Sequence, residues 1–173
     1  SNASYMLFKE MERQQELSIN YVKLRNNTLI NRDDIRNFAL NEFSFLTKGY
    51  SFSQPRIIES VWLTDLYYLN DFLVIDICLE FRDFYFSILL LKLQQGVLST
   101  NSIIEEREGR CKDLITLISE KAWPIDEKLL IFPKRKWNNI DMQFLYNKLH
   151  QDKLILESVI DIILEQQSTI FIK

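Results

Sequence analysis

The alternation of side chains from Phe72 to Phe81 restricts the fold more than any other feature of this sequence. One face of this stretch carries large apolar residues: Leu73, Ile75, Ile77, Leu79 and Phe81. The other face carries Phe72, Val74, Asp76, Cys78 and Glu80. A period of two is typical of a β-strand. The polar pair Arg82-Asp83 and the apolar run Phe84–Leu93 follow, which predicts a second long strand, covered on both faces and joined to the first by a hairpin.

On either side of this region the period changes to that of a helix. Residues 5–24 predict one helix. A second helix is expected to begin after Asn31, a capping residue type, and to close at Gly49 in the left-handed conformation. Helical spacing returns from 109 to about 168. Helices, then a small sheet, then helices is the α+β pattern.

The length of 173 residues suits a single domain. Ser1-Asn2-Ala3 is typical of the remnant of a cleaved expression tag, and we leave it out of the fold. We expect residues 4–173 to form one α+β domain. Its N-terminal helices should precede an antiparallel meander of three to four strands at about 56–96 and a helical part at about 109–168.

Composition excludes several classes of function. Three glycines leave no material for a glycine-rich phosphate loop, and a single histidine excludes a multi-histidine metal site. A net charge of -3 and a pI near 5.3 argue against general nucleic-acid binding, which needs a basic face. We expect no cofactor and no bound metal.

The chain also lacks signals for membranes and export. Phe84–Leu91 is the longest uncharged apolar stretch near the middle, with eight residues, whereas a membrane helix needs about 20. Phe8–Arg13 is charged where a signal peptide would be apolar. Cys78 and Cys111 are too few for a disulfide framework, so we expect free thiols in a reducing compartment. These features predict a cytoplasmic protein without a membrane partner.

One pair of carboxylates suggests catalysis. Asp76 and Glu80 share a strand face about 13 Å apart. With Asp65 or Asp71 they would resemble carboxylates that hold Mg²⁺ in a nuclease or hydrolase. The simpler interpretation is a solvated strand face with a Glu80–Arg82 ion pair.

Cys111 and His150 form a second candidate pair, a thiolate and an imidazole. Arg110, Lys112 and a nearby helix start would lower the pKa of Cys111. The simpler interpretation is a half-buried thiol and a solvent-facing imidazole.

Two short charged runs stand out. Lys134–Trp137 is the basic cluster, and basic side chains beside an aromatic ring can bind a nucleic-acid backbone and stack a base. The simpler interpretation is a loop before the next helix. Glu105, Glu106 and Glu108 form an acidic run, which is either a solvated loop or a surface for a basic partner.

Aromatic residues crowd the predicted sheet, among them Trp62, Tyr67 and Tyr68. For any one of them a place in the core is the simpler assignment. Should one sheet face be exposed instead, its aromatic patch would mark an interface.

One longer pattern combines these parts. Its helical half is Phe43-x-Phe45-Leu46-x-x-x-Tyr50-x-Phe52. Its strand half contains Val61, Tyr67-Tyr68-Leu69-Asn70 and Leu73-x-Ile75-x-Ile77, and it ends in Glu80-x-Arg82-Asp83-Phe84-Tyr85-x-Ser87-x-x-x-x-x-Leu93-x-x-Gly96. Residues 38–96, which contain the pattern, resemble a group of small bacterial proteins of the toxin-immunity type. Some members resemble immunity proteins found beside polymorphic toxins or toxins of contact-dependent growth inhibition.

The resemblance implies a non-enzymatic protein that binds a cognate toxin domain and covers or distorts its active site. Such binding needs buried anchors and complementary charge. The candidate residues are Trp62, Tyr67 and Tyr68 as anchors, with Asp65, Asp71, Asp76 and Glu80 as acidic rim and Glu105, Glu106 and Glu108 as a second acidic surface. The alternatives are hydrolysis through Asp76 and Glu80, or nucleic-acid binding through Lys134–Trp137. A homodimer would form if Phe84–Leu93 were an edge strand.

Overall fold

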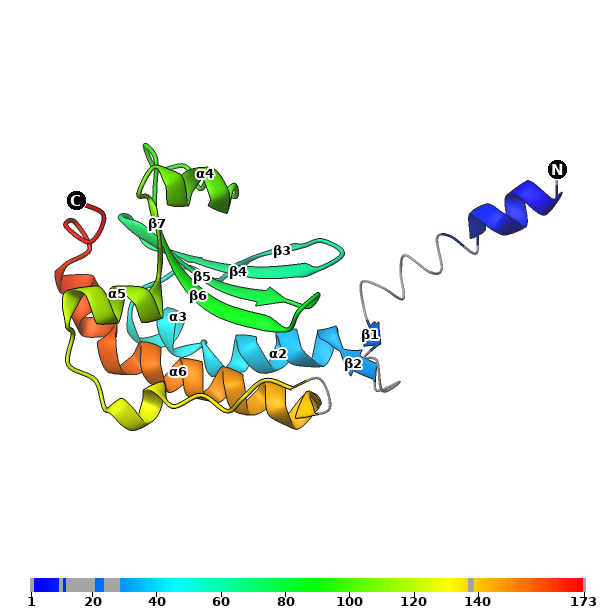
Figure 1. Ribbon diagram of the computed structural model, residues 1–173. Helices are drawn as coiled ribbons and strands as arrows, with labels where there is room; N and C mark the ends of the chain where they lie inside the picture. Colours follow the sequence, from blue (N-terminus) through cyan, green and yellow to red (C-terminus); the bar gives the residue numbers. More distant parts are fainter. Residues whose placement is uncertain (1, 10, 12–20, 24–28, 137–138, 173) are drawn as a thin grey trace.

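The computed structural model describes residues 2–9, 11, 21–23, 29–136 and 139–172 (Figure 1). A five-stranded antiparallel sheet of order β3-β4-β5-β6-β7 lies at its centre. The strands are β3 (Arg56–Glu59), β4 (Leu63–Leu69), β5 (Leu73–Glu80), β6 (Tyr85–Lys92) and β7 (Cys111–Asp113). The α+β class and the antiparallel meander, formed by β3 to β6, are confirmed.

The fifth strand was not predicted. β7 pairs with β6 from Leu89 to Leu91 after the chain has passed through α4 (Ser102–Arg107). Three residues are too few for a period of two to be recognised, so the helical part expected from 109 begins with a strand instead. β7 also covers this part of β6, which is therefore not the free edge that a homodimer through Phe84–Leu93 would require.

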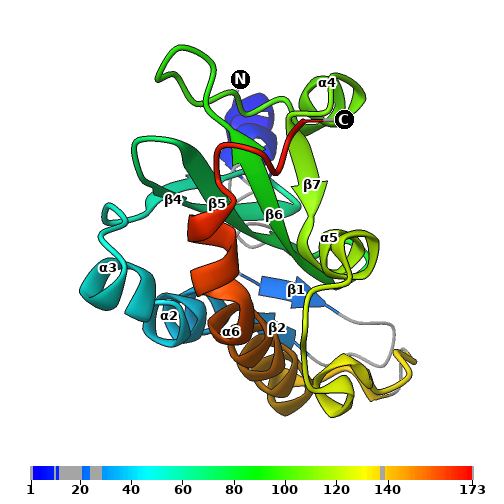
Figure 2. The same cartoon turned by 90° about the vertical axis from the view of Figure 1, so that its left-hand side faces the viewer.

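Helices cover one face of the sheet. They are α2 (Arg32–Glu42), α3 (Phe45–Gly49), α5 (Leu114–Lys121), the 3-10 helix η1 (Glu127–Leu130) and α6 (Met142–Glu165). Figures 1 and 2 show α2 and α6 side by side beneath the sheet. None of the helices in the described part of the chain is long and apolar enough to cross a membrane.

The main core lies between the sheet and these helices. The predicted apolar face of β5 and the following turn faces the helices and is at most 1% exposed: Leu73, Ile75, Ile77, Leu79 and Phe81. Leu149, Ile155 and Val159 of α6 pack in the same cluster. Phe45 and Tyr50 join it as an edge-to-face pair with ring centroids 6.0 Å apart, which fastens α3 to the core.

The second predicted helix begins as expected. The amide of Asp34 donates to Oδ1 of Asn31 at 3.1 Å, which caps α2. The helix then breaks after Glu42 and resumes at Phe45 as α3. Gly49 ends α3 without the left-handed conformation that we expected; Ser51 adopts it, with φ 61°.

The N-terminal prediction is partly wrong. Residues 2–9 and 11 are helical, but Tyr21–Lys23 forms β1, which pairs antiparallel with β2 (Leu29–Asn31). Val22 lies opposite Ile30 in this pairing, so the segment is a strand and not the helix that its spacing suggested. Positions 10, 12–20 and 24 of the predicted helix lie outside the described residues.

Candidate functional site

The β3–β4 hairpin exposes apolar side chains at one edge of the sheet. Five of them are between 36% and 44% exposed: Ile57, Ile58, Val61, Trp62 and Leu63. β3 is the edge strand, and its adjacent Ile57 and Ile58 point to opposite faces. Val61, Trp62 and Leu63 follow one another at the turn, and exposed apolar residues with a tryptophan among them are typical of a protein-binding surface.

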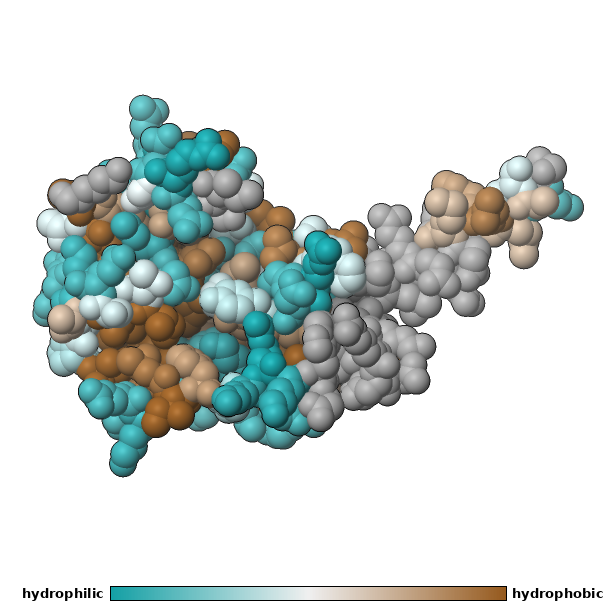
Figure 3. All heavy atoms as spheres, viewed as in Figure 1, coloured by the Kyte–Doolittle hydropathy of each residue, from teal (hydrophilic) through white to brown (hydrophobic). Residues whose placement is uncertain are grey.

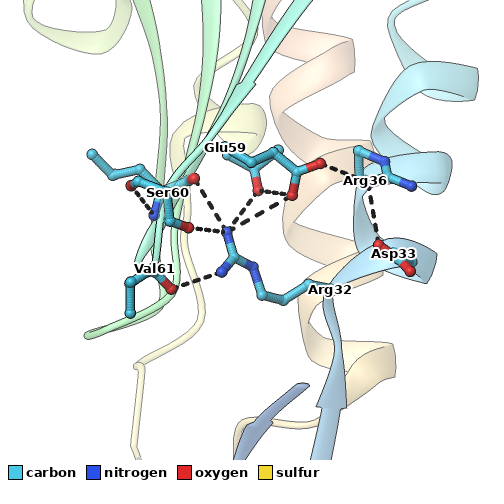
Figure 4. Close-up of polar contacts among 8 residues, drawn as sticks. Arg32, Asp33, Arg36, Glu59, Ser60 and Val61 are labelled. Atoms are coloured by element: carbon cyan, nitrogen blue, oxygen red, sulfur yellow. Dashed lines mark hydrogen bonds and ion pairs between the residues drawn. The ribbon is translucent and has the colours of Figure 1, made fainter. Parts of the chain in front are cut away.

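Arg32 of α2 holds the turn of this hairpin from below (Figure 4). Its Nη1 donates to the carbonyl of Val61 at 2.7 Å, and its Nη2 donates to the carbonyls of Ser60 and Leu63, both at 3.1 Å. Nη2 also donates to Oγ1 of Thr64 at 2.9 Å. The side chain of Arg32 is fully buried, so these bonds are shielded from water.

Two further contacts complete this anchor. The guanidinium of Arg32 lies 4.6 Å from the ring centre of Phe81, and the amide of Phe81 donates to the carbonyl of Trp62 at 2.8 Å. Glu59 accepts from Arg36 at 2.6 Å and lies 4.0 Å from Arg32. The backbone of the turn is therefore fixed while the indole of Trp62 projects outward, a preorganised arrangement that lowers the entropic cost of binding.

The face of the sheet opposite the helices holds three of the predicted residues. Register places Asp65 opposite Cys78 and Tyr67 opposite Asp76. One carboxylate oxygen of each aspartate and the sulfur of Cys78 all lie within 4.8 Å of one another. This acidic-thiol cluster, formed by Asp65, Asp76 and Cys78, lies on the same sheet face as a small apolar core that contains Val74, Leu89 and Leu91.

Asp76 is not on a solvated face, as the simpler interpretation had assumed. It is 3% exposed, and its Oδ1 is buried without a hydrogen-bond partner among the described residues. Burial and the neighbouring carboxylate of Asp65 raise the pKa of Asp76 well above the usual range. Burial also raises the pKa of Asp65. Two carboxylates this close share a proton at neutral pH.

The two carboxylates of the hydrolase alternative do not converge. Both oxygens of Glu80 accept backbone N–H groups, from Arg82 at 2.9 Å and Asp83 at 2.8 Å. Glu80 therefore caps the β5–β6 turn, and these backbone bonds replace the ion pair that we expected with Arg82. Asp71 lies in the exposed β4–β5 turn at the other end of β5.

The predicted anchors separate into one exposed residue and two buried ones. Trp62 is 44% exposed, whereas Tyr67 and Tyr68 are 4% and 1% exposed. Adjacent residues of a strand point to opposite faces, so Tyr68 enters the main core and Tyr67 the smaller apolar cluster on the other face. Burial of both tyrosines removes them from any partner surface.

The acidic run separates in the same way. Glu105 is 3% exposed and binds Arg110 through both oxygens, at 2.8 and 3.1 Å, which fixes α4 to the start of β7. Glu106 and Glu108 are exposed and free to face a partner.

The proposed dyad does not come together, and one residue of the basic cluster has a structural role. Burial raises the pKa of Cys111 to about 12, opposite to the expected direction. His150 lies on α6 with Nδ1 3.0 Å from Glu42 and is not brought to Cys111.

In the basic cluster, Arg135 donates to the carbonyls of Asp83 and Phe84, at 3.1 and 2.8 Å, and anchors its loop. Trp137 lies outside the described residues.

A groove of about 430 Å³ lies between β6, α5 and α6; Arg135 of the basic cluster lines it, but none of the predicted partner-binding residues does. Figure 3 shows apolar side chains gathered on this side, below the sheet. One ion pair interrupts its lining, with Nζ of Lys148 2.7 Å from Oδ1 of Asp152. Burial raises the pKa of Asp152 to about 6, against the opposing effect of Lys148.

Comparison of the chain with known proteins found no matching family model, no matching curated protein and no matching solved structure. The function therefore has to be argued from the residues of this chain.

Proposed function

We propose that this chain is a non-enzymatic protein of the toxin-immunity type, which binds a bacterial toxin domain through its β3–β4 hairpin. The observation that carries the proposal is the exposed apolar tip around Trp62 on a turn that Arg32 holds from below. The resemblance over residues 38–96 supplies the class of partner, and the hairpin supplies the face.

The hairpin combines the two elements of a tight interface. Trp62, Val61 and Leu63 are apolar anchors of the type that carries most binding energy. Carboxylates lie beside them, since Asp65 is half-buried on β4 and Glu59 keeps about a quarter of its side chain exposed. Such a rim favours a partner with basic groups around its active site and speeds the encounter. Binding there would block a toxin stoichiometrically.

The experiment is calorimetric titration of the full chain with the C-terminal domain of the large toxin-like protein encoded beside it, if one exists, together with growth rescue on co-expression. We expect a one-to-one complex. Trp62→Ala should weaken it by at least about thirtyfold, as for a central aromatic anchor. The matched control is Phe72→Ala, because Phe72 is 57% exposed at the opposite end of β4 and lies away from the hairpin tip.

The outcomes separate cleanly. Loss of binding in Trp62→Ala with Phe72→Ala unaffected supports the hairpin as the interface. Equal effects of the two substitutions, or none, would place the interface elsewhere. Absence of any complex with the wild-type chain would overturn the immunity function itself.

A further inference from the structure

We propose that Asp65, Asp76 and Cys78 form a binding site for one zinc-like divalent transition-metal ion on the sheet face opposite the helices. This site is independent of the proposed toxin binding, and its geometry comes from strand register. Asp65 on β4 lies directly opposite Cys78 on β5, and Asp76 occupies the same face two residues earlier on β5. The three potential ligand atoms lie within 4.8 Å of one another.

The unpartnered oxygen of Asp76 points to a ligand. A buried carboxylate oxygen without a hydrogen bond costs free energy, and native proteins usually satisfy such atoms with protein groups, water or an ion. Here Oδ1 of Asp76 is buried without a partner among the described residues, and the nearest charged group is a second carboxylate rather than a cation. A metal ion would satisfy this oxygen and remove the repulsion between the two aspartates.

The donor set selects the class of metal. A thiolate beside two carboxylates suits Zn²⁺ or Co²⁺, whereas Mg²⁺ and Ca²⁺ prefer oxygen ligands alone. Ligand atoms around a tetrahedral zinc ion lie roughly 3–4 Å apart, so the ligands need to move together by only about 1 Å. Three protein ligands leave the fourth position for water.

Hydroxyl groups flank two of the ligands. Tyr67 lies two residues from Asp65 on the same face of β4, and Ser87 of β6 lies opposite Cys78. Polar groups beside metal ligands hold them in place and adjust their basicity. Asp65 and Cys78 are only partly buried, which leaves a path for the ion from solvent.

The test is titration of the full, chelator-treated and reduced chain with Co²⁺, followed by displacement with Zn²⁺. We expect one Co²⁺ per chain, with a thiolate-to-cobalt charge-transfer band that disappears on addition of Zn²⁺. Cys78→Ser should abolish the band, and Asp76→Asn and Asp65→Asn should each weaken binding at least tenfold. Cys111→Ser is the matched control, since Cys111 is a free cysteine on the same sheet face but outside the cluster, and it should keep the band.

Thermal denaturation gives a second measurement. Zn²⁺ should raise the melting temperature of wild type and Cys111→Ser but not of Cys78→Ser or Asp76→Asn, because an ion that binds the folded state stabilises it. Circular dichroism in chelator confirms that each variant is folded, and the half-buried Asp65→Asn replaces any variant that is not. No cobalt uptake by wild type, or a band that persists in Cys78→Ser, would overturn the proposal.

Discussion

Arg32 and Asp76 are both buried charged side chains, 1% and 3% exposed, on opposite faces of one sheet, yet their surroundings are opposite in kind. The end of the Arg32 guanidinium meets three carbonyls, a hydroxyl and an aromatic ring. Asp76 meets a second carboxylate and keeps one oxygen without a partner among the described residues.

The different surroundings of these two side chains distinguish a residue that stabilises the fold from one that binds a ligand. The Nη atoms of Arg32 bind four groups of the hairpin, although its Nε, like Oδ1 of Asp76, has no hydrogen-bond partner among the described residues. A buried charge on which several backbone carbonyls depend is part of the fold, because removing it would leave those carbonyls unsatisfied. A buried charge beside another of the same sign gives the fold nothing that an apolar residue would not give better. Arg32 is thus explained by the hairpin that it holds, and Asp76 is explained by a cation that the cluster can bind.

The largest expected effect is that of Arg32→Met. The substitution keeps most of the side-chain volume but leaves the carbonyls of Ser60, Val61 and Leu63 without their donor. Loss of one partner from a buried charged network costs about 3–5 kcal/mol of the free energy of unfolding. Urea denaturation monitored by circular dichroism measures this change.

Arg36→Gln is the matched control for Arg32→Met. Arg36 is on the same helix and binds Glu59 and Asp33, but its side chain is 24% exposed. A partly exposed pair contributes about 0.2–1 kcal/mol. If both substitutions cost the same, the interpretation of Arg32 as the anchor of the hairpin is wrong.

Asp152 on α6 provides an intermediate case, a buried carboxylate with one cationic partner, Lys148. Its folded-state pKa of about 6 exceeds the ordinary value of 3.8 through burial, with Asp113 adding to the rise. The folded chain therefore binds more protons than the unfolded chain between those values, so stability falls as pH rises from about 4 to about 6.

Asp152→Asn removes this titration. From pH 4 to pH 7, wild type should lose roughly 2–3 kcal/mol of unfolding free energy relative to the variant. Parallel urea denaturation of both proteins across this range measures the difference, which cancels the titration of all other groups. A constant difference would mean that Lys148 compensates the burial of Asp152 completely.

The sequence predicts the centre of the fold better than its edges. The period of two in β5 is long enough to identify the strand and its core face. Asn31, a residue type that caps helices, indicates the start of α2. β7 and β1 have three residues each, too few to show a period. β7 also pairs with Leu89–Leu91 of β6 across the intervening α4, a contact that local spacing does not report.

The site was less predictable for a related reason. The residue types of Trp62 and Asp76 make both of them candidates for a site. Only tertiary packing decides that Trp62 is exposed and Asp76 is buried. Asp65 meets Cys78 through the register of two strands, and that register follows from the length of the β4–β5 turn. Arg32 carried no signal, since an arginine in the first turn of a helix normally faces solvent.

The smallest expected effect is that of Asp76→Asn in the presence of chelator, and it has the opposite sign to that of Arg32→Met. The amide of asparagine can donate to Asp65 at any pH, whereas the carboxyl of Asp76 can donate only when it holds a proton. We expect the free energy of unfolding at pH 7 to rise by roughly 1–2 kcal/mol.

Asp71→Asn, in the exposed β4–β5 turn, is the control and should change stability by no more than about 0.5 kcal/mol. Destabilisation by Asp76→Asn would show that the carboxylate has a structural partner. Asp76 would then stabilise the fold, as Arg32 does. Stabilisation without metal, together with loss of the zinc-induced rise in melting temperature, is a combination that a purely structural residue cannot produce. That combination would mean that Asp76 destabilises the metal-free protein and is needed for binding the metal.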